Sequence, residues 1–260
     1  MFTTFLKNYY SEIYSKYASV LVSSHAPNNI IKDTVAIEVV SGDERLIKKD
    51  LRYILDKISF PILNSTTGLY KKALQLRALR YLKSRKIPQE KIKELYVGYE
   101  DFITSDNSYF LNNSIIIPFT YNNIVYTFQA RTLKENATNK YLTVKEENEI
   151  KIYNYFNADK NKTVFITEGP IDSWFLENGI STAGTISFNS PVVGLIKSKF
   201  KDRIWVFDND SAGLKRTKDF IDAGEKIFIW TSSEWKSYKD INKVVEGTNL
   251  SISQITDYVK

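Results

Sequence analysis

The chain has no cysteine and a single histidine, His25, among its 260 residues. The lack of thiols excludes disulfide frameworks, cysteine-based zinc sites and thiol nucleophiles. One histidine is too few for a histidine-rich metal site, so any metal here would be a hard cation held by carboxylates. Long apolar runs are missing too, and none approaches the roughly 20 residues that a membrane-spanning helix needs. We therefore expect no membrane association.

The overall composition is that of an ordinary globular protein, with 43% hydrophobic and 25% charged residues. The length is sufficient for two domains with their own cores. Three charged residues interrupt the N-terminal region, where the apolar stretch of a signal peptide would lie: Lys7, Glu12 and Lys16. We therefore expect an intracellular, cytoplasmic protein.

The positive charge is concentrated in one segment. The formal net charge is +6, whereas residues 69–95 alone contain nine Lys and Arg and two Glu, a net +7. The apolar spacing in this segment predicts an amphipathic helix with a basic face, followed by a short helix that starts near Pro88. The face is either solvated or contacts phosphates of a nucleic acid. The candidates for such contacts are Arg77, Arg80, Lys83, Arg85 and Lys86.

The N-terminal half mixes helical and β patterns. Apolar spacing predicts helices over residues 2–21 and 43–58, the latter capped by Ser41 or Asp43, with a strand over residues 34–40 between them. Two further β runs, residues 114–121 and 124–130, are separated by an Asn-Asn pair. Because asparagine tolerates positive φ, we predict a tight hairpin there.

From residue 162 onward, short β runs alternate with helical segments, which favours a parallel sheet with right-handed crossovers. We predict an α/β fold whose mainly parallel, four-stranded sheet is flanked by helices, preceded by an α+β part. The predicted strands cover residues 163–167, 180–187, 203–207 and 226–230, and the predicted helices residues 171–177, 192–200 and 214–223.

Acidic residues follow three of these strands. Glu168 and Asp172 follow the first in EGPID, Asp208 and Asp210 the third in FDNDSAG, and Asp240 the fourth in YKDIN. Ligands of such sheets bind at the carboxyl ends of the strands. Clustered carboxylates repel one another unless a divalent cation binds or one is protonated, and oxygen ligands favour Mg²⁺ or Mn²⁺. The alternative is that the aspartates are helix caps.

The three segments resemble the signature motifs of the Toprim domain, which DnaG-type primases, topoisomerases and some nucleases share. Upstream, YLKSRKIPQEKIKELYVGYE, SIIIPF, FQAR and NKYLTV resemble successive motifs of the catalytic core of DnaG-type primases. The runs EGPIDS, ENGI, DAGE and WKS are most similar to those of the primases of T-even-type bacteriophages. The resemblance extends from roughly residue 80 to the C-terminus, and so many ordered motifs make coincidence improbable.

The resemblance implies a role for each matching residue. Glu168 would be a metal ligand or acid/base beside the reacting phosphate, and Asp208 and Asp210 would be catalytic and hold Mg²⁺ or Mn²⁺. Asp240 would complete the metal site. The residues expected to line the groove for the template and the incoming nucleotide are Arg131, Lys140, Lys239 and Asp172.

The implied activity is that of a DNA primase, a DNA-directed RNA polymerase. It would make short RNA primers from ribonucleoside triphosphates on single-stranded DNA during phage-type replication, in a primosome with a replicative helicase. Primases of this family usually carry a zinc-binding domain, and this chain has no cysteine to build one. A separate zinc-bearing subunit would then recognise the template, or initiation would show little sequence preference. A second departure is Asn242, where an aspartate is common.

Two alternatives stay open at this point. A Toprim nuclease would use the same carboxylates for hydrolysis, and a non-catalytic replication subunit would only bind nucleic acid. Trp235 and Tyr238 precede Asp240 in a polar segment and are candidates for contact with nucleic acid or nucleotide. We divide the chain into a module of unknown role (residues 1–65), an N-terminal primase-core subdomain (66–160) and a Toprim domain (161–260).

Overall fold

A computed structural model describes residues 46–260, apart from residues 104–107, 148 and 233. The described residues belong to one unit of the chain, Gly42–Lys260. The helix predicted over residues 2–21, the strand predicted over residues 34–40 and His25 lie outside the described residues. The proposed domain boundaries at residues 65 and 160 stay predictions.

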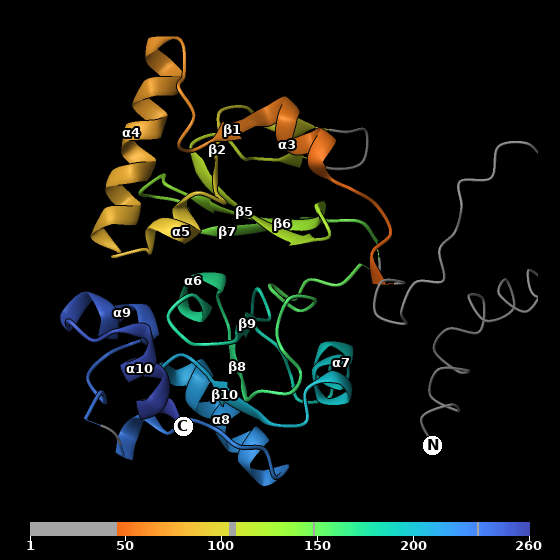
Figure 1. The fold of residues 1–260 in the computed structure, drawn as a ribbon, viewed down its shortest axis with the longest axis vertical. Coiled ribbons are helices and arrows are strands. Elements are labelled where there is room, and N and C mark those ends of the chain that lie inside the picture. Colours follow the sequence, from red (N-terminus) through yellow and green to blue (C-terminus); the bar gives the residue numbers. More distant parts are fainter. Residues whose placement is uncertain (1–45, 104–107, 148, 233) are drawn as a thin grey trace, which may run out of the picture. The chain divides into compact units, whose positions relative to one another are not determined.

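The first half of the described chain is built around an antiparallel sheet. Its strands are ordered β1-β2-β5-β6-β7, and every neighbouring pair is antiparallel. Helices α3 and α4 lie beside this sheet in Figure 1. The elements are α3 (Arg52–Ile58), β1 (Ser59–Pro61), α4 (Leu69–Ser84), α5 (Gln89–Ile92), β2 (Tyr96–Gly98), β3 (Phe102–Ile103), β4 (Ser108–Tyr109), β5 (Ser114–Tyr121), β6 (Ile124–Thr132) and β7 (Tyr141–Lys145).

The predicted hairpin is confirmed. β5 and β6 pair from Tyr121 opposite Ile124 back to Ser114 opposite Thr132. The two connecting residues, Asn122 and Asn123, have φ of 45° and 63°. Two successive positive φ values characterise the turn whose twist matches that of the flanking strands. Most side chains of both strands are buried, so this hairpin forms the centre of the sheet.

The second half forms a parallel sheet flanked by helices. Its strand order is β10-β8-β9, with parallel pairing on both sides of β8. The strand after each crossover returns parallel to its predecessor, as βαβ alternation predicts. The elements are β8 (Val164–Thr167), α6 (Pro170–Ser173), β9 (Gly179–Ser181), α7 (Pro191–Lys199), β10 (Arg203–Val206), α8 (Ser211–Asp222), η2 (Trp230–Ser232), α9 (Ile241–Gly247) and α10 (Ile252–Val259).

The α/β fold is confirmed, but this sheet has three full strands, not the predicted four. The fourth segment contributes one parallel bridge, between Trp205 and Ile227. The chain then turns away, because the indole of Trp230 donates a hydrogen bond to the carbonyl of Phe207 at 2.7 Å. The segment therefore folds over the end of β10 and cannot continue along its edge.

Two predicted helices are shorter than expected. Within the described residues, the helix predicted over residues 43–58 begins at Arg52, because the Asp50 carboxylate accepts hydrogen bonds from the backbone N–H groups of Arg52 and Val125, both at 3.0 Å. This tethers the preceding residues to β6. The predicted caps of this helix, Ser41 and Asp43, lie outside the described residues. The helix predicted over residues 171–177 ends at Ser173, and the chain turns so tightly that a Cβ on Gly179 would lie 2.2 Å from the Ser173 carbonyl oxygen.

Trp235 is a core residue, which contradicts the prediction that it contacts nucleotide. Only 3% of its surface is exposed, and its ring stacks on Tyr258 of α10 with centroids 4.0 Å apart. Tyr238 is half-buried. The sequence around Trp235 is polar and gave no indication of burial, because the residue that packs on it belongs to a helix distant in the sequence.

Within the described part of the chain, no helix is long and apolar enough to cross a bilayer.

Candidate active site

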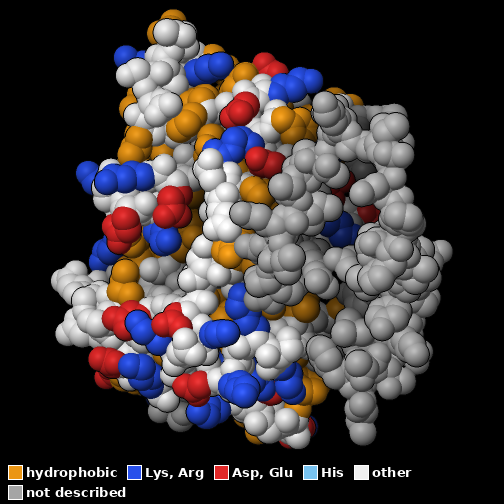
Figure 2. Space-filling model, turned by 45° about the vertical axis from the view of Figure 1, so that its right-hand side comes forward, with side chains coloured by type: hydrophobic (Ala, Val, Ile, Leu, Met, Phe, Trp, Pro, Cys, Tyr) orange, Lys and Arg blue, Asp and Glu red, His pale blue; other side chains and the backbone are white. Residues whose placement is uncertain are grey.

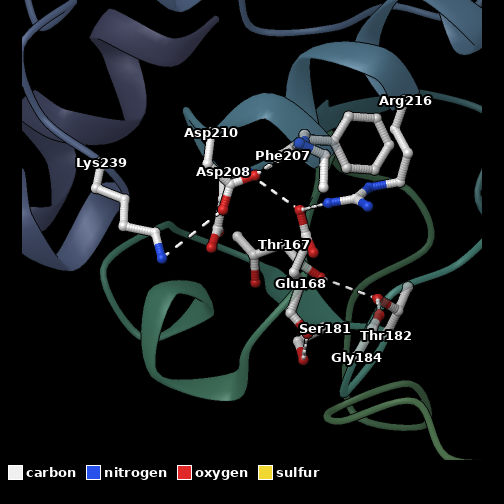
Figure 3. Close-up of polar contacts among 12 residues, drawn as sticks. Thr167, Glu168, Ser181, Thr182, Gly184, Phe207, Asp208, Asp210, Arg216 and Lys239 are labelled. Carbon is white, nitrogen blue, oxygen red and sulfur yellow. Dashed lines mark hydrogen bonds and ion pairs between the residues drawn. The ribbon is translucent and has the colours of Figure 1, made fainter.

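Glu168 lies directly after β8, at the carboxyl end of the parallel sheet. Its backbone carbonyl accepts hydrogen bonds from the N–H of Gly184 at 3.0 Å and from the hydroxyl of Ser181 at 3.3 Å. Its side-chain Oε1 accepts the backbone N–H of Asp208 at 3.2 Å, as Figure 3 shows. Glu168 is therefore held at a place where the ends of all three strands meet.

Asp208 follows β10 and lies among other carboxylates. Burial raises the pKa of Asp208 to about 7, with further contributions from the charges of Glu168, Asp240 and Asp210, while Lys239 opposes the rise. Like charges that cannot spread into water favour the protonated form of one member. Such crowding of carboxylates is the property expected of a site for a divalent cation.

Asp210 serves as the N-cap of α8. Its Oδ1 accepts the backbone N–H groups of Ala212 and Gly213 at 3.1 and 3.0 Å. Its Oδ2 lies 3.7 Å from the ammonium of Lys239. The cap interpretation is therefore correct for the local structure, but it uses only one carboxylate oxygen, and the other faces the site.

Gly213 allows the start of α8 to pack against the strand end. A Cβ at this position would lie 1.8 Å from the carbonyl oxygen of Asp208, a distance that no side chain can occupy. Glycine is therefore required for close backbone approach, not for an unusual φ. The first turn of α8, which Asp210 caps, therefore packs directly against the backbone of Asp208.

Asp240, the N-cap of α9, and Asp172, a residue of α6, complete the acidic group. Asp240 caps α9 by accepting the N–H of Lys243 at 2.7 Å. Burial raises the pKa of Asp172 well above its ordinary range, as do the charges of Asp240 and Asp208. Asp172 also accepts the backbone N–H of Asn242 at 2.9 Å. The structure thus brings all five predicted carboxylates into one electrostatically coupled group.

The side-chain amide of Asn242 is bonded to Arg85. Its amide oxygen accepts a hydrogen bond from the Arg85 guanidinium at 2.7 Å, and its amide nitrogen donates to the Arg85 carbonyl at 2.9 Å. The residue is 1% exposed. Both ends of the Asn242 amide are therefore used to join α9 to the end of α4.

Arg216 is a member of the site that the sequence did not single out. Its guanidinium donates to Glu168 Oε1, and its side chain is 10% exposed. It lies on the buried face of α8, together with Gly213 and Phe220. Arg216 is spaced three and four residues from Gly213 and Phe220, so the sequence places it on the buried face of the helix. An arginine on a buried face needs an anionic partner, and this was the signal in the sequence that could have identified it. The partner lies 48 positions earlier in the chain, beyond any local pattern.

The basic residues predicted to line the groove differ in their surroundings. Arg131 is 8% exposed, and its guanidinium carbon lies 5.4 Å from the ring centroid of Tyr81 and 5.1 Å from that of Tyr141. Lys140 and Lys239 are exposed. Arg131 is thus held between aromatic rings, whereas the two lysines lie at the surface, where Lys239 pairs with Asp210.

The basic face of α4 divides into two parts. The first part consists of three exposed residues spaced three positions apart, Arg77, Arg80 and Lys83. The second part is used within the protein: Arg85 binds Asn242 and lies 3.2 Å from Glu246, and Lys86 donates to the Thr248 carbonyl at 2.7 Å. Among the described side chains visible in Figure 2, Lys and Arg are interspersed with Asp and Glu.

The donor set fits a hard cation, because it consists of carboxylate oxygens that repel one another. In the described part of the chain, however, no three His, Cys, Asp or Glu side chains converge closely enough to hold a metal ion. The bond of Glu168 Oε1 to Arg216 and the caps made by Asp210 and Asp240 are consistent with this.

Comparison with known proteins agrees with this geometry. The Toprim-like family matches residues 165–245, which include all five carboxylates of the acidic group. Residues 165–245 are thus similar to the Toprim-like family. The chain is also 36% identical over 195 residues to a DNA primase of Enterobacteria phage T4, a match that covers 70% of this chain. The chain spans 55% of that relative's length.

Solved structures confirm the fold of a DnaG-type catalytic core around this Toprim domain. The RNA polymerase domain of Mycobacterium tuberculosis primase DnaG matches with a TM-score of 0.56 and 16% identity, covering 72% of this chain and 76% of that one. A DnaG primase catalytic domain bound to single-stranded DNA matches with a TM-score of 0.55 and 16% identity, covering 78% of this chain and 74% of the other. The predicted resemblance is thereby confirmed at the level of fold.

Proposed function

We propose that this chain is the catalytic subunit of a DNA primase, which links ribonucleoside triphosphates into short primers on single-stranded DNA. The observation that carries the proposal is the 36% identity to the phage T4 DNA primase, combined with the acidic group at the ends of the Toprim strands. The nucleotidyl transfer requires stabilisation of charge that develops on phosphate oxygens.

Glu168, Asp208, Asp210 and Asp240 are the residues that would hold Mg²⁺ or Mn²⁺. When bound, such cations neutralise charge on the attacking and leaving oxygens. Asp208, whose pKa is raised to about 7 by burial and neighbouring carboxylates, is the group that would ionise on binding a cation.

Arg131, Lys140, Lys239 and Asp172 are proposed to line the path of the template and nucleotide. Arg131 is the best suited to bind a phosphate in a fixed place, because the rings of Tyr81 and Tyr141 restrict its guanidinium. The exposed face of α4 would add contacts to the template backbone that do not depend on sequence. A replicative helicase and a zinc-bearing subunit that recognises the template are the proposed partners.

The test is nucleotide incorporation by the full chain on single-stranded DNA with NTPs and Mg²⁺, with and without a replicative helicase. The double variant Asp208→Asn with Asp210→Asn should lower primer synthesis at least a hundredfold and leave DNA binding within about threefold, because the acidic group is needed for catalysis and not for phosphate contact. The matched control is Asp219→Asn with Asp222→Asn, which removes the same charge from the exposed face of the same helix, α8.

The outcome also separates the alternatives. A primase lengthens a new strand, whereas a Toprim nuclease shortens the labelled DNA with the same dependence on Asp208 and Asp210. A chain that binds DNA but incorporates no nucleotide under any of these conditions would be a non-catalytic subunit. Full primer synthesis by the Asp208→Asn, Asp210→Asn variant would refute the assignment of the active site.

A further inference from the structure

Glu168 and Arg216 form an ion pair inside the candidate site. Nη2 of Arg216 donates a hydrogen bond to Oε1 of Glu168. The exposed fraction of the side chain is 10% for Arg216 and 14% for Glu168. Removing charges from water costs several kcal/mol per ion unless each has a partner. Each of these two groups is therefore the principal counter-charge of the other.

The surroundings of Arg216 hold its guanidinium in place. The guanidinium carbon lies 5.6 Å from the ring centroid of Phe207, and Nε is buried without a hydrogen bond among the described residues. Figure 3 shows Arg216 reaching Glu168 from α8, on the side of Glu168 opposite to Lys239. The guanidinium is thus directed at one carboxylate, and a rotation away from Glu168 would leave it buried without an anion.

Both hydrogen bonds to the Glu168 side chain fall on the same oxygen. Oε1 accepts from Arg216 and from the backbone N–H of Asp208, and no bond to Oε2 is present among the described residues. The arrangement fixes the orientation of the carboxylate and leaves Oε2 available. It also places a positive charge beside the oxygens that a divalent cation would bind, so the cation and the guanidinium compete for one negative charge.

We propose that Arg216 is a positioning residue that competes with the divalent cation for Glu168. In the protein without cation, Arg216 neutralises Glu168 and holds it against the Asp208 backbone, which limits repulsion with the Asp208 carboxylate. A cation that binds Glu168 weakens the attraction between Glu168 and Arg216. The chain therefore binds the cation less tightly than the same carboxylates would without Arg216. This inference rests on the proposed metal site.

The test is titration of the full chain with Mn²⁺ by calorimetry, without nucleotide or DNA. Arg216→Gln removes the charge and keeps a side chain of similar shape, and it should lower the Mn²⁺ dissociation constant about tenfold, because one unit charge close to the ion is lost. Arg216→Lys keeps the charge and should stay within about threefold of the unmodified protein.

A matched control removes an exposed cation from the same helix. Lys218 lies on α8, as Arg216 does, and is exposed. Lys218→Gln should therefore change the dissociation constant no more than about twofold, since water and salt screen an exposed charge. In a Glu168→Gln background, Arg216→Gln should have no further effect beyond about twofold, because the proposed competition acts through Glu168.

Two results would overturn the inference. One is an Arg216→Gln variant that is folded by circular dichroism and binds Mn²⁺ no more tightly than the unmodified protein. The other is an equal gain in the Glu168→Gln background, which would mean a general field effect and no competition for that carboxylate. Absence of Mn²⁺ binding in the unmodified protein would remove both the metal site and this inference.

A measurement without substitution covers the case in which Arg216→Gln does not fold. Addition of Mg²⁺ to the unmodified protein should shift the ¹⁵N side-chain resonance of Arg216, assigned by its loss in Arg216→Lys, while that of Arg203, which pairs with Glu225, stays in place. An Arg216 resonance that does not respond at saturating Mg²⁺ would contradict the competition. Failure of primer synthesis with the Mn²⁺ results intact would refute only the proposed function.

Discussion

The raised pKa of Asp208 predicts that this catalytic candidate destabilises the protein when no cation is bound. Burial and the charges of Glu168 and Asp240 raise the pKa of Asp208 from its ordinary value of 3.8 to about 7. Between these two pH values the folded chain binds more protons than the unfolded chain, so the free energy of unfolding falls as the pH rises. Above pH 7 the full penalty is present.

The size of the penalty follows from the shift. One pKa unit corresponds to about 1.36 kcal/mol, so the shift of Asp208 sets an upper bound of about 4 kcal/mol. Asp208 is partly exposed, and Lys239 and solvent screen it. We therefore expect Asp208→Asn, which keeps the shape and removes the charge, to raise the free energy of unfolding by about 1–3 kcal/mol at pH 8.5. The gain should shrink to near zero at pH 4.

Urea unfolding in EDTA at pH 4, 6 and 8.5 measures these differences by linear extrapolation. The control is Asp222→Asn, whose exposed carboxylate ends α8 and should change stability by less than about 0.5 kcal/mol at every pH. The reasoning is refuted if Asp208→Asn is no more stable than the unmodified protein at pH 8.5. A gain of the same size at every pH would equally contradict it, because ionisation would then not be the cause.

The remaining predictions concern backbone packing and DNA binding. Gly213→Ala should lower the free energy of unfolding by about 2–4 kcal/mol, because its Cβ would overlap the Asp208 carbonyl. Gly194→Ala, within α7, should raise it by about 0.5–1 kcal/mol, because no atom lies within 4 Å of its Cβ. Thermal unfolding compares the two variants, and equal effects would contradict the close approach of Gly213 to Asp208. On the basic face, the three exposed residues to neutralise are Arg77, Arg80 and Lys83. The slope of log DNA affinity against log salt concentration should then fall by about one unit per lost phosphate contact. An unchanged slope would mean that this face is only solvated.

Local chemistry was sufficient for the elements that depend on neighbours in the sequence. The Asn122-Asn123 pair predicted the hairpin because the turn needs two residues that tolerate positive φ, and both have it. The positions of Glu168, Asp208 and Asp210 at strand ends followed from βα alternation, because parallel strands end at one edge. These conclusions need only the order of residues along a short segment.

Predictions failed where a distant partner decided the outcome. The start of α3 depends on Asp50 bonding to Val125, 75 positions away. Trp235 is buried by Tyr258 of α10, although its own neighbours are polar. A propensity or periodicity argument contains no information about such partners, because it considers only residues within a few turns of each other.

The sequence by itself determined the class of the sheet, the hairpin, the basic segment and the carboxylates that the Toprim strands present. Only the tertiary structure decided how these charges are compensated. It paired Glu168 with Arg216 and used Asn242 to hold Arg85, 157 positions away. The physical reason is that a buried charge must find its counter-charge in space, and the fold, not the spacing along the chain, determines which group is within reach.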